Sequence, residues 1–441
     1  MAAAKKTPAK KVPAKKAPAK KAAARKTPRR PRAAPGRQLS VRMYDVGFGD
    51  AFLLQIPDGN RTRRVLFDCG SIEASNAGGP MKDCVQRIIA DATDPDGVAR
   101  IDVVVATHRH KDHVSGFANG AWAGVEVKEV WMPWTEHPTD KEARRIRELQ
   151  SKLAAGLNVA LAAAPAAVNA AAAAERAVAA GIVANALVLS NEPAMTTLHS
   201  GFAGQPVRRF LPVREAGARL LETDALPGVR VHVLGPSRDP EVIRDMDPPK
   251  GESYLRLRAA IADGTGTTVP PFAHEFIVDD PSGTWTFLPT DAERIAQAGS
   301  LSELAVAVAL DKAVNGTSLM LLLDVAGTYL LFPGDAQWGT WLNVLDDPEW
   351  RTLLERVSFY KIGHHGSHNA TPRRFVADLL PVGCCAMAST LVRTIWPEIP
   401  KAGLLTALLQ KTAVVARSDK PDKAPQSFRV SPGVIEARVP F

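Results

Sequence analysis

Three histidines and one aspartate lie within a single short segment, which reads THRHKDH over residues 107–113. Imidazole and carboxylate groups are ligands that a borderline cation such as Zn²⁺ accepts. His108 and His110 lie two positions apart and can point the same way. Asp112 and His113 can then face a second ion about 3.5–4 Å from the first, the usual spacing in two-metal hydrolases. The alternative is a polar loop that holds three histidines by chance.

The elements that must position this segment are short buried strands. Residues 101–106 read IDVVVA, a continuous apolar run that is typical of a strand buried on both faces. Three other apolar runs lead into Asp68, into Asp335 and into the pair His364 and His365. A single aspartate after a strand more often caps a turn or a helix than binds a metal. Four such sites are harder to dismiss, because α/β sheets gather their functional groups at strand ends.

The rest of the chain alternates between β-rich and helix-rich stretches. Residues 317–323 and 328–332 predict a hairpin around Ala326 and Gly327. Residues 140–189 are rich in Ala, Leu, Glu, Lys and Arg and predict helices. Further strands are expected at residues 39–45, 51–56, 64–68, 125–132, 229–234, 357–362 and 383–388. The pattern indicates a layered α/β sandwich over residues 39–441, with insertions at residues 140–200 and 237–310 that could roof a cleft.

The N-terminal segment repeats a unit of Lys, Ala and Pro: KKTPA, KKVPA, KKAPA, KKAAA and RKTPR. Recurring proline blocks a continuous helix, and the composition cannot bury apolar surface, so we expect residues 1–38 to be disordered. The segment resembles the Lys/Ala/Pro-rich tails of linker histones and of bacterial histone-like proteins. Its candidate nucleic-acid contacts are Lys5, Lys6, Lys10, Lys11, Lys15, Lys16, Lys20 and Lys21.

The positive charge of the chain belongs to this tail. Residues 1–40 hold fourteen of the 55 basic side chains and none of the 46 acidic ones, so residues 41–441 carry a net charge of −5. Such a tail can neutralise phosphates along DNA or RNA without reading sequence, and the binding should depend steeply on salt. The alternatives are a solubilising arm and a contact with an acidic protein. We predict nucleic acid as the partner of the tail, and no protein partner.

Cysteine content and hydropathy indicate the compartment. The four cysteines form no C-x-x-C pair, which favours a reducing, cytoplasmic setting. The N-terminal cations have no apolar stretch behind them, unlike a secretory signal. Residues 153–189 are apolar but mostly alanine and are interrupted by polar side chains, so we predict a soluble protein with no membrane segment.

Taken in order, the motifs resemble those of the metallo-β-lactamase superfamily, whose pattern is H-x-H-x-D-H with an earlier Asp, a later Asp and a later His. The closer match is to its ComEC-like branch, a domain that is attached to DNA-uptake channels and also occurs as stand-alone proteins. Four segments carry the resemblance: YDVGFGDA at residues 44–51, the strand end at Asp68, NGTSL at residues 315–319, and PGDA at residues 333–336 followed by GHHGS at residues 363–367. The resemblance implies a four-layer αββα sandwich with helical insertions.

It also implies a set of metal ligands. His108 and His110 would hold one ion, Asp112 and His113 would hold the other, and Asp335 would bridge the two.

Two adjacent histidines and an earlier aspartate complete the implied centre. One of His364 and His365 should complete the second site; we favour His365 as the ligand, which leaves His364 to contact substrate or to protonate a leaving group. Asp68 resembles the buried acid of the family that orients the histidine loop. The candidate catalytic residues are therefore Asp112, His364 and Asp68.

The sequence departs from the superfamily at one ligand. Most members have a further histidine between the second and fourth motifs, and this chain has Asn315 and Ser318 near that place. The first metal would then have two histidines, the bridge and water. One Zn²⁺ ion instead of two, and Mn²⁺ instead of Zn²⁺, both stay open. Asn315, Ser318, Ser367 and His368 are candidate substrate contacts.

The expected chemistry is metal-assisted hydrolysis, in which a metal-bound hydroxide attacks an electrophilic phosphorus or carbonyl carbon. The basic tail and the ComEC-like motifs favour a phosphodiester, so the first hypothesis is a nuclease or phosphodiesterase acting on DNA or RNA. The second is a hydrolase of small-molecule esters, thioesters or lactones. The third is a nucleic-acid-associated protein whose metal site is structural or idle.

Overall fold

The computed structural model describes residues 37–75, 78–163, 170–186, 188–214, 219–239, 303–367, 369–393, 398–412 and 414–441, together with a few residues between 242 and 253. All of them belong to one unit, Ala33–Phe441. The expectations for the tail up to residue 36, for residues 254–300 of the second insertion and for His368 lie outside the described residues.

The first sheet has eight strands in the order β14-β15-β1-β2-β3-β4-β5-β6. Strands β3 to β6 run parallel, and the pairs from β14 to β3 are antiparallel. The bounds are β1 (Gln38–Tyr44), β2 (Ala51–Asp58), β3 (Arg61–Cys69), β4 (Arg100–Val105), β5 (Glu126–Pro133), β6 (Val207–Leu211), β14 (Phe428–Ser431) and β15 (Val434–Pro440). Because β3 and β4 are parallel neighbours, Asp68 and the segment after β4 lie at the same edge of the sheet.

The second sheet has seven strands in the order β13-β12-β11-β10-β9-β8-β7. The bounds are β7 (Leu220–Leu221), β8 (Val229–Gly235), β9 (Met320–Val325), β10 (Thr328–Phe332), β11 (Val357–Lys361), β12 (Cys385–Ala388) and β13 (Val414–Arg417). The expected hairpin is confirmed: β9 and β10 pair antiparallel, and Ala326 and Gly327 turn between them with positive φ. Strands β10 and β11 are parallel, so Asp335 and His365 follow neighbouring strand ends.

The two sheets share a hydrophobic core. Val103 and Val105 of β4 lie in this core with Phe332 of β10, whereas Val104 lies in a different cluster, as strand alternation requires. The rings of Phe67 and Phe332 stack with centroids 3.8 Å apart. Burying each such side chain contributes about 1.5–3 kcal/mol to the stability of the fold. This core therefore holds in place the strand ends that carry the polar groups.

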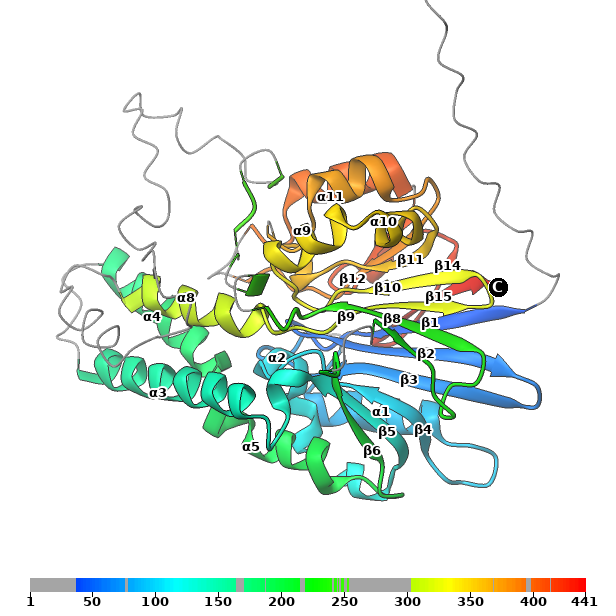
Figure 1. Ribbon diagram of the computed structural model, residues 1–441, viewed down its shortest axis with the longest axis horizontal. Helices are drawn as coiled ribbons and strands as arrows, with labels where there is room; N and C mark the ends of the chain where they lie inside the picture. Colours follow the sequence, from blue (N-terminus) through cyan, green and yellow to red (C-terminus); the bar gives the residue numbers. More distant parts are fainter. Residues whose placement is uncertain are drawn as a thin grey trace, which may run out of the picture. The chain divides into compact units, whose positions relative to one another are not determined.

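Helices pack against both sheets on the side away from this core (Figure 1). Side chains of α1 join the cluster that contains Val104, and those of α9, α10 and α11 join a cluster with the second sheet. The helices are α1 (Met81–Ala92), α2 (Lys111–Val114), α9 (Trp338–Asp346), α10 (Pro348–Leu354) and α11 (Ala402–Thr412). Single helical turns are η1 (Ser115–Ala118), η2 (Gly120–Gly124), η3 (Trp134–Glu136), η4 (Thr197–Gly201), η7 (His364–Gly366), η8 (Phe375–Leu379) and η9 (Pro421–Lys423).

The helices expected over residues 140–189 are confirmed. Figure 1 shows α3, α4 and α8 lying together beside α2. Leu157, Ile182 and Ala307 are buried among these helices. Their bounds are α3 (Lys141–Ala163), α4 (Ala170–Ala186), α5 (Val188–Thr196) and α8 (Glu303–Asn315). Within the described part of the chain, no helix has the length and apolarity needed to cross a membrane.

Candidate metal centre

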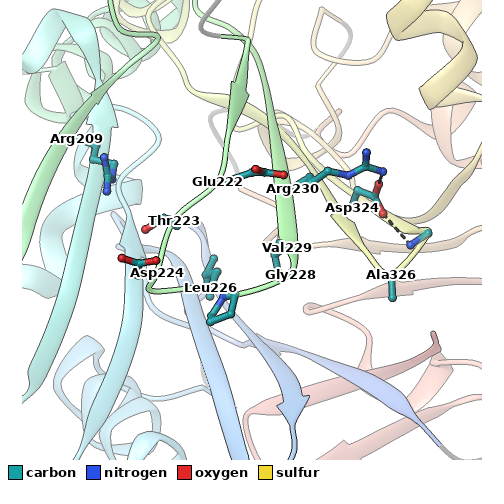
Figure 2. A pocket seen from close by; sticks show the side chains of 12 residues that line it. Arg209, Glu222, Thr223, Asp224, Leu226, Gly228, Val229, Arg230, Asp324 and Ala326 are labelled. Carbon is teal, nitrogen blue, oxygen red and sulfur yellow. Dashed lines mark hydrogen bonds and ion pairs between the residues drawn. The ribbon is translucent and has the colours of Figure 1, made fainter.

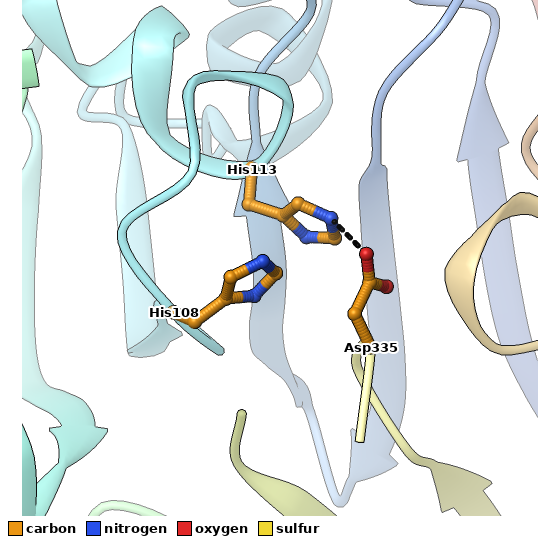
Figure 3. Close-up of side chains that lie close together, drawn as sticks. All are labelled: His108, His113 and Asp335. Atoms are coloured by element: carbon orange, nitrogen blue, oxygen red, sulfur yellow. Dashed lines mark hydrogen bonds and ion pairs between the residues drawn. The ribbon is translucent and has the colours of Figure 1, made fainter. Parts of the chain in front are cut away.

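The histidines and aspartates that follow three strand ends converge in one buried cluster. Each side chain is 3% exposed or less: His108, His110, Asp112, His113, Asp335 and His365. They come from the ends of β4, β10 and β11, which the shared core brings together. Figure 3 shows His108, His113 and Asp335, from two separate loops, pointing toward one another. These six residues, which the sequence named as candidate ligands, therefore lie together.

His108 and His110 form one side of the cluster. Nε2 of His108 lies 3.1 Å from Nδ1 of His110. Two ligands that share one tetrahedral Zn²⁺, with bonds of about 2.0–2.1 Å, lie roughly 3.3 Å apart. The second nitrogen of His108, Nδ1, lies 3.1 Å from the hydroxyl of Thr107. The pair is therefore spaced to hold a single cation.

His113 contacts both Asp335, the candidate bridging ligand, and Asp68. Its Nε2 lies 3.1 Å from Oδ2 of Asp335, and its Nδ1 lies 2.8 Å from Oδ2 of Asp68 (Figure 3). Asp68 also accepts hydrogen bonds from the backbone N–H and the hydroxyl of Thr107, at 2.7 and 2.8 Å. A carboxylate that holds the outer nitrogen of an imidazole fixes the tautomer and the ring orientation. Asp68 has the geometry expected of the orienting acid.

The adjacent histidines at the end of β11 occupy different environments. Nε2 of His365 lies 3.2 Å from Oδ2 of Asp112, and its Nδ1 donates to the carbonyl of Ser389 at 3.0 Å. His364 lies beside Asp335, with 3.8 Å between Nε2 and Oδ2, and its side chain is 18% exposed. Of the two, His365 lies among the other candidate ligands, and His364 is nearer to solvent.

The donor atoms form three sets that are close enough to hold an ion. The sets are His108, His113 and Asp335; Asp112, His113 and His365; and Asp50, Asp68 and His113. In each set, all three ligand atoms lie within 4.8 Å of one another. The set of Asp112, His113 and His365 matches the second ion that the sequence predicts. The set with His108 and Asp335 contains His113 where the sequence predicts His110, and His110 belongs to none of the three sets.

The charges in the cluster suit a cation. Burial raises the pKa of Asp335, but His113 and His364 outweigh this effect and hold it well below its usual range. Burial lowers the pKa of His113, yet Asp335 and Asp68 raise it well above its ordinary value. Burial lowers the pKa of His110 to about 4. Asp335 is therefore ionised and His110 is neutral, as metal ligands must be, whereas His113 must lose a proton before it can bind a metal.

Two charged residues in the centre were not identified as site residues from the sequence. Lys361, the last residue of β11, is 3% exposed, forms an ion pair with Asp50, and lies 3.7 Å from Oδ1 of Asp335. Asp50 is 1% exposed and lies 3.7 Å from Nδ1 of His113. A lysine at the end of a buried apolar strand was the available signal, because an unpaired charge is rarely buried. Lys361 offsets part of the negative charge of the cluster.

A third missed residue, Asp311, comes from α8. Its Oδ1 lies 3.8 Å from Nε2 of His110, and its side chain is 19% exposed. Nδ2 of Asn315 donates to its Oδ2 at 3.0 Å. Burial and the neighbouring Asp112 and Asp335 raise the pKa of Asp311 to about 7. The sequence carried no signal for Asp311 beyond its place four residues before Asn315.

The four candidate substrate contacts lie in different surroundings. Asn315 and Ser318 are fully buried beside the centre, since the next residue, Leu319, donates its N–H to the carbonyl of Thr107 at 2.8 Å. The hydroxyl of Ser367 donates to Oδ1 of Asn369 at 2.7 Å. His368 lies outside the described residues.

Asn191 of the first helical insertion and Glu136 of η3 contact Arg109, which lies between His108 and His110. Nδ2 of Asn191 in α5 donates to the carbonyl of Arg109 at 2.6 Å. The Arg109 guanidinium forms a buried ion pair with Glu136, with 2.8 Å between Nε and Oε1. Both contacts restrain the backbone between His108 and His110.

A separate polar cavity of about 790 Å³ lies at the other end of the sheets (Figure 2). It is next to the turn before β10, whereas Asp335 follows β10, so it is distant from the cluster. Arg230 and Asp324 form an ion pair in its wall. This cavity has no part in the candidate centre.

Fold and site together define a mixed α/β protein with two multi-stranded sheets and a buried His/Asp cluster that could bind a metal ion. No family model matches the chain. The chain is similar to the competence protein ComA of Neisseria gonorrhoeae, with 31% identity over 88 residues. These residues are 20% of this chain, and the chain spans only 11% of the length of that relative.

Proposed function

We propose that the chain is a metal-dependent hydrolase with a metallo-β-lactamase-like centre, and that its substrate is a phosphodiester of DNA or RNA. The observation that carries this proposal is the convergence of two ligand sets on His113 beside Asp335. Metal-binding histidines almost always have a partner at the nitrogen that does not face the metal. Asp68 and Ser389 each hold the outer nitrogen of a candidate ligand.

The donor set is suited to one or two divalent cations. His108 and His110 would hold the first ion, Asp112, His113 and His365 the second, with Asp335 between them. Imidazole-rich ligation favours Zn²⁺, and the carboxylates leave Mn²⁺ as a candidate. We also propose that the helices on the outer faces of the two sheets complete a four-layer αββα sandwich.

When bound, such cations would supply Lewis acidity at the reacting centre. The residues of the chain would do the rest. His364, the more exposed of the paired histidines, would contact the substrate and handle the proton of the leaving group. Lys361 would limit the repulsion among the carboxylates before an anionic substrate enters. Asp68 would keep His113 in one orientation.

Two features support a nucleic-acid substrate. The N-terminal segment concentrates fourteen basic residues, which would raise the local concentration of a polyanion. The motifs resemble the ComEC-like branch, and the partial similarity to a competence protein agrees with that resemblance. We further propose a cytoplasmic location, which the small number of cysteines supports.

The test is a substrate panel for the purified full chain with Zn²⁺ or Mn²⁺. Single- and double-stranded DNA, RNA, bis-p-nitrophenyl phosphate and a p-nitrophenyl ester would be compared, with Asp335→Asn as the inactive control. Cleavage of nucleic acid by the native chain alone supports the proposal. Cleavage of the ester alone would favour a small-molecule hydrolase. Stoichiometric metal with no turnover would favour a structural site.

A further inference from the structure

The imidazoles of the cluster share one arrangement, in which one nitrogen faces a candidate ligand and the other faces a supporting group. His113 directs Nε2 toward Asp335 and Nδ1 toward Asp68. His365 directs Nε2 toward Asp112 and Nδ1 toward the carbonyl of Ser389. His108 follows the same pattern, with the hydroxyl of Thr107 at its outer nitrogen. Metal-binding histidines almost always have such an outer partner.

His110 has the same arrangement with the nitrogens exchanged. Its Nδ1 lies 3.1 Å from Nε2 of His108, so Nδ1 is the nitrogen directed at a shared ion. Its Nε2 is buried, and no hydrogen-bond partner for it occurs among the residues that the structure describes. A carboxylate oxygen of Asp311 lies 3.8 Å from this nitrogen.

We propose that Asp311 is a positioning residue: its carboxylate accepts a hydrogen bond from the Nε2–H of His110, which keeps the proton on Nε2 and presents the Nδ1 lone pair to the metal that His108 also binds. The inference rests on the proposed metal centre. The present separation exceeds hydrogen-bond length, and the partial exposure of Asp311 leaves its side chain room to rotate toward the ring.

The surroundings of Asp311 favour this role. Asn315, one helical turn away, donates to Oδ2 of Asp311 and leaves Oδ1 for His110. Leu310 and Val314 of α8 are buried against Ala154 of α3, which holds the helix in place. Helix α8 would therefore supply the outer support of the first metal site, where a third imidazole ligand is missing from the motif.

The experiment compares Asp311→Asn with Asp311→Leu in the full chain. Asparagine keeps a hydrogen-bond acceptor but no charge, and leucine keeps neither. Stepwise Zn²⁺ affinity would be measured by chelator competition, and the tautomer of His110 by NMR of isotope-labelled histidine. We expect one of the two binding steps to weaken by about 10–100-fold in Asp311→Leu and by less in Asp311→Asn. The His110 tautomer should become mixed in Asp311→Leu.

The same two substitutions at the exposed Asp378 serve as matched controls and should change neither readout. Thermal unfolding in EDTA separates misfolding from a local effect, because the Asp311 variants should be at least as stable as the native chain without metal. An equal loss of Zn²⁺ affinity in the Asn and Leu variants would show that Asp311 acts through its charge and would refute the proposed hydrogen bond. Unchanged affinity and tautomer would refute the role of Asp311 alone, whereas a native chain that takes up no Zn²⁺ would also refute the metal centre.

Discussion

Asp68 and His113 are joined by a contact of 2.8 Å between Oδ2 and Nδ1, although 45 positions separate them in the chain. The opposite nitrogen of His113 faces Asp335 at 3.1 Å. The imidazole is therefore held between a supporting acid and a candidate bridging acid, and the ring can offer Nε2 to a cation in one orientation only.

Replacing Asp68 with asparagine should loosen this arrangement. We expect Zn²⁺ bound through His113 to dissociate about 10–100-fold more readily. The neutral amide stabilises the proton on Nδ1 of His113 less than the charged carboxylate does. Competition with a chromogenic chelator measures the change. Asp58→Asn, in the exposed end of β2, is the control. Native metal affinity in Asp68→Asn would show that Asp68 supports only the backbone of Thr107.

Asp335→Asn should abolish turnover and lower the bound metal from the native stoichiometry, since Asp335 forms one ligand set with His108 and His113, and the second set shares His113. Elemental analysis of dialysed protein, together with the substrate panel, measures both effects. Asp324→Asn is a matched control on the same hairpin, at the end away from the centre. Full metal content in Asp335→Asn would contradict a bridging role.

Lys361→Met should destabilise the chain by about 3–5 kcal/mol in EDTA, because it leaves the buried Asp50 without its cation. Adding Asp50→Asn to Lys361→Met should recover part of the loss, since the orphaned charge is then removed. Urea unfolding in EDTA and in Zn²⁺ provides the measurement. Zn²⁺ should stabilise Lys361→Met more than it stabilises the native chain, because the metal would then neutralise the carboxylates that Lys361 neutralises. Equal stabilisation of the two proteins would contradict this role of Lys361.

Metal affinity should rise with pH. The pKa of His113 is raised well above its ordinary value, so a proton occupies the ring at neutral pH and the metal must displace it. Affinity therefore falls as the pH decreases and levels off only above the raised pKa. His110, with its pKa near about 4, is neutral at neutral pH and adds no proton release there. Calorimetry in buffers of different ionisation enthalpy would count the released protons; none at neutral pH would contradict the assignment.

Deleting residues 1–38 should weaken nucleic-acid binding and reduce its salt dependence, with turnover of bis-p-nitrophenyl phosphate unchanged. Each lost phosphate contact should lower the slope of log K against log salt by about 0.9. Fluorescence anisotropy over a salt series measures the slope. A parallel loss of small-substrate turnover would show that the tail takes part in catalysis.

Much of the fold could be predicted from local patterns. The apolar run before Thr107, the hairpin at Ala326 and the alanine-rich helices all occur where periodicity indicated them. Strands β6, β7, β13, β14 and β15 were missed, because they are short or expose polar side chains. Strand β14, for example, has four residues, and all but Phe428 are exposed. Such strands owe their conformation to the neighbours with which they pair, and a single sequence does not reveal those neighbours.

The sequence by itself determined which residue types could bind a metal, because His108, His110, Asp112 and His113 share one short segment after one strand. The family resemblance favoured His365 over His364 as a ligand, and the tertiary structure shows His365 beside Asp112 and His364 nearer to solvent. The tertiary structure alone brought Asp311 and Lys361 to the cluster. Their contacts with His110 and Asp50 depend on helix packing and sheet pairing between segments far apart in the chain, and local sequence does not encode such contacts.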